Sequence, residues 1–141
     1  MFALDTNVIS EMTRPRPDAG VVRWLEETPR SALFLPSVVV AELLTGIEML
    51  PVGRKREGLT GFISAFISAT PAENLLVFGF EEAVRYAAIF ALRRRQGRTI
   101  KHLDAQIAAI AAAQHMPIVT RNVRDFEQCG IEVVNPWDAE A

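Results

Sequence analysis

The sequence contains one cysteine, Cys129, and two histidines, His102 and His115, among its 141 residues. A single cysteine excludes an internal disulfide and is typical of a chain that works in a reducing compartment. These three residues have none of the short spacings that a zinc site requires, so no zinc centre is expected. We interpret Cys129 as a small hydrophobic side chain near a turn, not as a nucleophile.

Long apolar runs and a strong net charge are also absent. No stretch approaches the roughly 18 apolar residues that span a bilayer, and acidic residues 5 and 11 interrupt the N-terminal segment, which has no signal-peptide pattern. We therefore expect a soluble, cytoplasmic protein with no membrane partner. The formal charge of −2 predicts no general affinity for polyanions, so any contact with nucleic acid needs a local basic patch.

What is present predicts an α/β fold. A chain of 141 residues that is 50% hydrophobic forms a single domain, residues 1–141. Short apolar runs alternate with helical patterns, which favours a mainly parallel sheet in a three-layer α/β/α sandwich. Strands are expected at residues 2–4, 32–35, 75–78, 118–120 and 132–134. Helices are expected at residues 21–27, 38–50, 54–68, 81–95 and 103–115.

Asp5 stands directly behind the first predicted strand. If the strand order is 3-2-1-4-5, the first and fourth strands are neighbours and the switch point of the sheet lies between them. That order is an assumption at this stage. It predicts that Asp5 and the segment after Thr120 face one crevice. The simpler interpretation, that Asp5 only caps the next helix, stays open.

Two further acids stand in apolar helices. Glu42 lies in a helix that is apolar nearly all round, with Ser37 as its expected N-cap, which predicts a buried glutamate. Such a residue needs a partner or a metal, although a solvent gap or a bond to Thr45 would also explain it. Asp104 occupies the first turn of an alanine-rich helix, where the helix dipole alone would favour an acid.

Four segments are similar, in order and spacing, to the motifs of the PIN-domain family, and the chain's last residues resemble the VapC and FitB toxins within it. The matching segments are Asp5–Ser10, Val40–Gly46, Asp104–Ala109, Thr120–Phe126 and, near the end, Val134–Trp137. The resemblance implies strand order 3-2-1-4-5 and a Mg²⁺-dependent endoribonuclease toxin of a type II toxin–antitoxin module. It further implies an RNA substrate, an inhibitory antitoxin, DNA contact only through that antitoxin, and a homodimer.

The resemblance also implies the site residues. Asp5, Glu42 and Asp104 match the first three acids of the family site, and the fourth position falls to Asn122 or Asp125, both of which stay open. We expect Asp5 and Asp104 to bind the metal directly, and Glu42 and Asp125 to act through water. Asn122 would support the site by coordinating through its carbonyl or orienting a water.

Two threonines and the choice of metal complete this prediction. Thr6 and Thr120 are expected to orient the carboxylates. Neighbouring carboxylates repel one another, so a divalent cation is the expected neutralising group. A set of oxygen ligands selects Mg²⁺, with Mn²⁺ as the alternative.

A basic stretch precedes Asp104 and is the expected RNA-binding surface. The stretch contains Arg93, Arg94, Arg95, Arg98 and Lys101, and the candidate RNA contacts among them are Arg93, Arg94, Arg98 and Lys101. Such residues give affinity for phosphates and little sequence selectivity, and the helix dipole alone would also favour cations at a helix end.

Two predictions concern partners and the alternative function. Helix 81–95 has more apolar residues than a single core-facing stripe contains. Its second apolar face is therefore expected to pack against a second copy of the chain, against the antitoxin or against a large part of the core. Asn122 in place of an acid leaves open a FitB-like binding module, which acts in an antitoxin-mediated complex on DNA with weak or no nuclease activity.

Overall fold

The computed structural model describes residues 1–138, and its centre is a five-stranded sheet. The strands are β1 (Phe2–Leu4), β2 (Leu33–Pro36), β3 (Leu75–Leu76), β4 (Ile118–Val119) and β5 (Val133–Val134). They are ordered β3-β2-β1-β4-β5 and every neighbouring pair is parallel. The predicted strand order is confirmed. Residues 139–141, which the predicted domain includes, lie outside the described residues.

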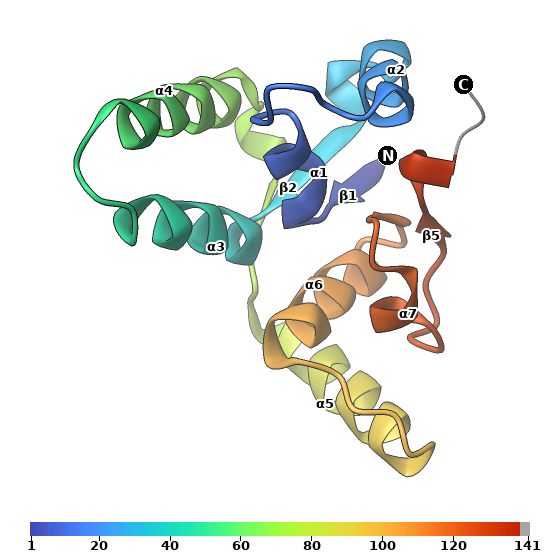
Figure 1. The fold of residues 1–141 in the computed structure, drawn as a ribbon. Coiled ribbons are helices and arrows are strands. Elements are labelled where there is room, and N and C mark those ends of the chain that lie inside the picture. Colours follow the sequence, from blue (N-terminus) through green and yellow to red (C-terminus); the bar gives the residue numbers. More distant parts are fainter. Residues whose placement is uncertain (139–141) are drawn as a thin grey trace.

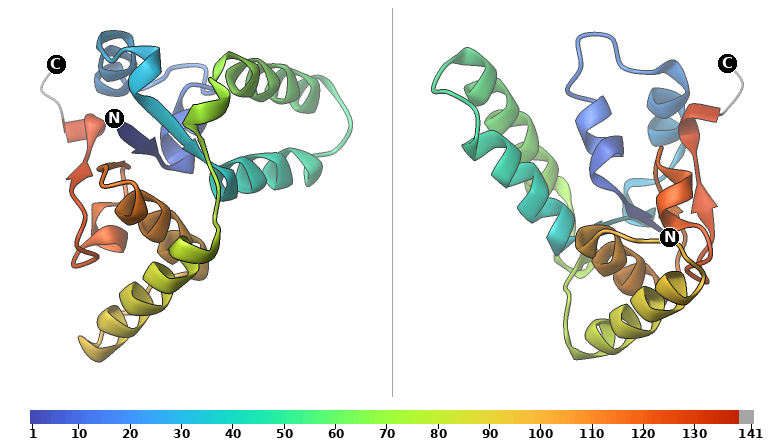
Figure 2. Two further views of the ribbon diagram at one scale, coloured as in Figure 1. Left: turned by 180° about the vertical axis from the view of Figure 1, so that it is seen from behind. Right: turned by 60° about the horizontal axis from the view of Figure 1, so that its bottom comes forward.

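Helices cover both faces of the sheet, as predicted for a three-layer sandwich (Figure 1). On one side lie α1 (Thr6–Glu11) and α2 (Ala19–Glu27), and on the other lie α5 (Phe80–Arg95) and α6 (His102–Ala113). A hairpin that projects away from the sheet, seen from two further sides in Figure 2, is formed by α3 (Ser37–Glu48) and α4 (Arg54–Ala69). The short α7 (Val123–Phe126) follows β4, and one-turn helices are η1 (Arg30–Ala32), η2 (Ala72–Asn74) and η3 (Pro136–Asp138).

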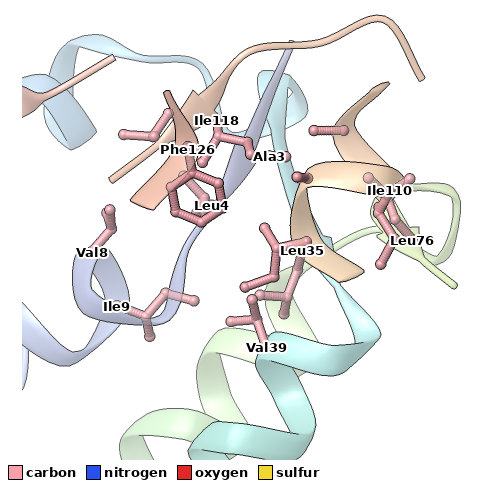
Figure 3. Close-up of a cluster of buried hydrophobic side chains, with 14 of the residues drawn as sticks. Ala3, Leu4, Val8, Ile9, Leu35, Val39, Leu76, Ile110, Ile118 and Phe126 are labelled. Carbon is pink, nitrogen blue, oxygen red and sulfur yellow. The ribbon is translucent and has the colours of Figure 1, made fainter. Parts of the chain in front are cut away.

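The core lies between the sheet and these helices (Figure 3). Side chains that are almost or completely inaccessible to solvent come from every layer, among them Leu4, Leu35, Val39, Ile110 and Phe126. The alanines of α6 at positions 105, 108, 109 and 111 are fully buried, because a methyl side chain lets a helix lie close to its neighbours. Within residues 1–138, no helix is long and apolar enough to cross a lipid bilayer.

Several local details differ from the predictions. The short helices α1 and α7 are absent from the predicted helix ranges, because six and four residues are too few for a clear periodic pattern. Asp5 is the N-cap of α1, so the capping role that the sequence analysis kept open for it is present. Ser37 is the first residue of α3, and Pro36 stands at the N-cap position without a side-chain hydrogen bond, so the predicted Ser37 cap is wrong. Gly97 follows the end of α5 and has a φ of 71°, a backbone conformation that suits glycine at a helix end.

Candidate active site

The parallel pairing of β1 with β4 brings two residues that are distant in sequence together. Asp5 follows β1 and Thr120 follows β4, and the Thr120 Oγ1 donates a hydrogen bond of 2.8 Å to Asp5 Oδ2. Both residues are buried. The backbone N–H of Asp5 also bonds to the carbonyl of Val119 at 3.0 Å. The predicted meeting of these two strand ends at one crevice is therefore confirmed.

Four acids line one cleft of about 300 Å³ at these strand ends. Asp5 comes from the end of β1, Glu42 from α3, Asp104 from the first turn of α6 and Asp125 from α7. The remaining lining residues are Thr6, Asn7, Ser10, Lys101, Leu103 and Asn122. The structure thus brings together all four predicted acids, although they are spread over the length of the chain.

Hydrogen bonds hold the Asp5 carboxylate in one orientation. Oδ1 accepts from the backbone N–H of Thr6 at 2.7 Å, and Oδ2 accepts from Thr120 Oγ1 at 2.8 Å and from Asn7 Nδ2 at 3.3 Å. A carboxylate offers about four lone pairs. The described residues therefore leave Asp5 room for one further ligand on Oδ1.

Asn7 is a site residue that the sequence analysis missed. Its Nδ2 donates to Thr120 Oγ1 at 3.2 Å as well as to Asp5, and its Oδ1 accepts from the backbone N–H of Arg121 at 3.3 Å. It therefore ties the end of β1 to the end of β4. Asn122 joins the same network through its backbone N–H, which donates to Thr120 Oγ1 at 3.0 Å. The position of Asn7 two residues after Asp5 was the available signal.

Glu42 is exposed, and the prediction that it is buried is wrong. The reason is the projection of the α3–α4 hairpin, which leaves one face of α3 in solvent; Leu44 on the same helix is 44% exposed. The partner of Glu42 is Thr6, whose Oγ1 donates to Oε2 at 2.9 Å. Thr6 therefore contacts two of the four acids, one through its backbone N–H and one through its hydroxyl.

The clustered negative charge changes the proton affinity of two acids. Burial, with the negative charges of Asp5 and Asp125 and against the positive charge of Lys101, raises the pKa of Asp104 to about 6. Burial also raises the pKa of Asp5, against the hydrogen bonds from Thr120 and Thr6, and the charges of Glu42 and Asp125 add to the increase. Both shifts show that the folded chain disfavours the fully ionised cluster.

These shifts predict how the stability of the metal-free chain depends on pH. The ordinary pKa of an aspartate is 3.8, whereas Asp104 in the folded chain keeps its proton up to about 6. Between pH 3.8 and pH 6 the folded state binds more protons than the unfolded state. The contribution of Asp104 to the free energy of unfolding is therefore complete below pH 3.8 and is lost as the pH rises through 6. Thermal unfolding in EDTA, from about pH 4.5 to about pH 7.5, should show a steeper loss of stability for the wild type than for Asp104→Asn. Parallel curves would contradict this prediction.

The four candidate RNA contacts before Asp104 have different environments. Arg93 is only 4% exposed, and both of its Nη atoms bond to backbone carbonyls, so the prediction that it binds RNA is corrected: its guanidinium is buried away from any phosphate. Arg94 is exposed. Arg98 pairs with Glu127 at 2.7 Å on the surface. Lys101 lines the cleft.

The acids do not form a closed metal cage. Within residues 1–138, no three Asp, Glu, His or Cys side chains are close enough to hold an ion between them. The donors that are available are carboxylate oxygens, which suit a hard cation such as Mg²⁺. Mg²⁺ usually binds one or two carboxylates and keeps several waters, and the free lone pair of Asp5 and the neighbouring Asp104 fit that requirement.

Comparisons with known proteins agree with this fold. Residues 2–131 match the PIN domain. The plasmid stability protein StbB of Pseudomonas syringae pv. tomato is 37% identical over 99% of this chain and 100% of its own length, and the VapC ribonuclease Y4jK of Sinorhizobium fredii is 33% identical over 98% and 99%. A solved structure of FitAB bound to an IR36 DNA fragment contains a chain with a TM-score of 0.94 and 34% identity, with 100% of this chain and 99% of that chain covered. This chain therefore belongs to the PIN-domain family.

Proposed function

We propose that this chain is a Mg²⁺-dependent endoribonuclease, the toxin of a type II toxin–antitoxin module that acts in the cytoplasm. The observation that carries the proposal is the convergence of Asp5, Glu42, Asp104 and Asp125 in one cleft where β1 and β4 end. Y4jK, a relative over nearly the whole chain, is named a VapC ribonuclease, which supports the same reaction class.

Asp5 and Asp104 are the proposed direct ligands of the ion. Thr6 and Thr120 already orient the Asp5 carboxylate, and Asp104 lines the same cleft. When held there, Mg²⁺ would polarise a phosphoryl oxygen and lower the pKa of the attacking water. Mn²⁺ would supply the same chemistry. Glu42 and Asp125 are proposed to hold water in the cleft. One of them would accept the proton that the attacking water releases as its oxygen bonds to phosphorus, while the bond from phosphorus to the leaving sugar oxygen breaks and that oxygen takes a proton from water.

Asp125 fits the fourth acidic position better than Asn122. The negative charge of Asp125 raises the pKa of both Asp5 and Asp104, so its carboxylate lies within electrostatic reach of the proposed ligands. Asn122 is exposed, and its backbone N–H already bonds to Thr120. We propose that Asn122 supports the strand end and that Asp125 supplies the charge.

The experiment that tests the proposal is cleavage of total cellular RNA by the purified chain, free of any partner. The expected result is a set of discrete fragments in Mg²⁺ and intact RNA in excess EDTA. Intact RNA in both conditions, from a chain that circular dichroism shows to be folded, would instead favour the second function below.

The second candidate function is that of a binding module that acts mainly in an antitoxin-mediated complex on DNA. It is favoured by the likeness to a FitAB chain whose solved complex contains DNA, and by an uncharged Asn122 at the cleft. In either function the partner is an antitoxin protein. With a net charge of −2, the chain is proposed to reach DNA only through that partner.

Lys101 and Arg94 are the proposed contacts to RNA phosphates, since Lys101 lines the cleft and Arg94 is exposed. Changing both to glutamine should weaken RNA binding and flatten its salt dependence by roughly 1.4 units of slope, the value for two phosphate contacts to a single strand. Filter binding at several salt concentrations measures the slope. The charge-matched control is Arg30→Gln with Arg85→Gln, because Arg30 precedes β2 and Arg85 lies beside Pro117, which precedes β4, at the other end of the strands from the cleft. This control should leave the slope unchanged. An unchanged slope in the Lys101 and Arg94 variant would contradict these two contacts.

A homodimer is proposed through the apolar outer face of α5. Val84 is 58% exposed and Leu92 is 42% exposed on that helix, while Ile89 points into the core. Light scattering of the wild-type chain should give twice the 15.6 kDa chain mass, because burying this face removes apolar surface from water. The variant Val84→Glu with Leu92→Glu should give the chain mass. A wild-type mass of one chain at all concentrations would contradict the proposal.

A further inference from the structure

Arg93 is a buried cation that has no assigned role in the proposed reaction. It lies in the last turn of α5 and is only 4% exposed. Its Nη1 lies within hydrogen-bond distance of three backbone carbonyls, those of Arg124 (3.4 Å), Asp125 (3.2 Å) and Glu127 (2.6 Å). Its Nη2 donates to the carbonyl of Thr99 at 3.1 Å. One side chain thus contacts two segments that are distant from each other in sequence.

The first of these segments is the C-terminal end of α7. That helix has only four residues, Val123–Phe126, with Glu127 as its C-cap. The last carbonyls of a helix have no partner within the helix, and a single turn has little stability of its own. Arg93 supplies the missing donors from another helix, through charge-assisted hydrogen bonds that are stronger than neutral ones.

The second segment is the connection from α5 to α6. The backbone N–H of Arg98 donates to the carbonyl of Arg93 at 2.9 Å, so the chain turns back towards the end of α5. This turn places the carbonyl of Thr99 within reach of the Arg93 guanidinium. Arg98 also pairs with Glu127 at 2.7 Å, which adds a second tie to the end of α7. The same connection leads directly into the first turn of α6, which carries Asp104.

We propose that Arg93 is a positioning residue that holds α7 against the start of α6 and thereby fixes Asp125 beside Asp104 in the cleft. This inference rests on the proposed ribonuclease function for its effect on catalysis. Arg93 bonds to the backbone carbonyl of Asp125 and not to its carboxylate, and it is given no contact with RNA. It acts through the backbone of the segment that carries Asp125.

The test compares Arg93→Met with Arg95→Met in the full chain. Methionine keeps much of the apolar stem of Arg93 but removes every donor, whereas Arg95 is exposed on the same helix end and serves as the matched control. Hydrogen–deuterium exchange should become at least about tenfold faster at residues 122–128 in Arg93→Met and stay unchanged in α6. The kcat for RNA cleavage should fall by about 10- to 100-fold with KM within about twofold, as for other residues that orient metal-site ligands. Arg95→Met should match the wild type in both measurements.

Arg93→Lys is the second variant, for use if the methionine variant does not fold. It keeps the charge but has one ammonium group in place of a planar fork, so it should give a smaller change of the same kind. Unchanged exchange at residues 122–128 would overturn the proposal, and so would faster exchange with an unchanged kcat. A wild-type chain that cuts no RNA would remove the proposed function instead, and the exchange measurement would still decide whether Arg93 holds α7.

Discussion

Replacing Asp104 by asparagine should reduce RNA cleavage by more than about 100-fold and at the same time stabilise the metal-free chain at neutral pH. The expected loss exceeds the 10- to 100-fold that outer residues of a metal site contribute, because Asp104 is a proposed direct ligand. The expected gain in stability follows from its raised pKa of about 6, which reflects burial and the charges of Asp5 and Asp125. A neutral amide removes that repulsion.

These two effects are measured on the same protein samples. Cleavage of total RNA is followed in Mg²⁺ and in excess EDTA, and thermal unfolding is followed in EDTA at about pH 7.5. Asp138→Asn, a substitution of the same kind at an exposed position, serves as the control and should change neither property. Cleavage by Asp104→Asn at the wild-type rate would refute the assignment of Asp104 to the metal. A loss of activity together with a loss of stability would indicate misfolding.

Replacing Phe126 by alanine should lower the free energy of unfolding by about 3–5 kcal/mol, the usual cost of removing a buried aromatic ring. Phe126 has no solvent exposure and belongs to the central core (Figure 3). It is also the last residue of α7 and directly follows Asp125. The ring therefore anchors the segment that carries an acid of the site, and a cavity beneath it should also reduce cleavage.

Urea unfolding of the wild type and the variant measures this difference. The control is Val52→Ala, because Val52 is 88% exposed and lies outside the α5 face proposed for the dimer, so its truncation should cost less than about 0.5 kcal/mol. A loss below about 1 kcal/mol for Phe126→Ala would contradict the view that this ring anchors α7.

The strand order was assumed from the alternating pattern and implied by the resemblance to the PIN-domain family, which also pointed to the acids and left the fourth position open. Their meeting in one cleft has a physical reason, because parallel strands gather their carboxyl ends at one edge of the sheet. Asp5 shows this most clearly, because the short apolar run before it is typical of a buried strand. Thr120 follows the fourth strand in the same way.

The environments of Glu42 and Arg93 were not predictable, because both depend on how whole helices pack. The apolar surface of α3 suggested burial, but the helix projects from the body with α4 and leaves Glu42 exposed. Arg93 and Arg94 are identical neighbours in the sequence, and only the rotation of α5 decides that the first is buried and the second is exposed. Helix propensity carries no information about that rotation.

The contact between Asp5 and Thr120 joins residues 115 positions apart, and this separation has a consequence for the order of events during translation. A ribosome that adds about 5–20 residues per second needs roughly 6–23 s to pass from the first to the second. Throughout that interval β1 has no β4 beside it. Asp5 lacks the hydroxyl donor of Thr120, and the set of acids from α6 and α7 is not yet complete. Under the proposed function, the cleavage site would therefore stay incomplete until the final segments of the chain have left the exit tunnel.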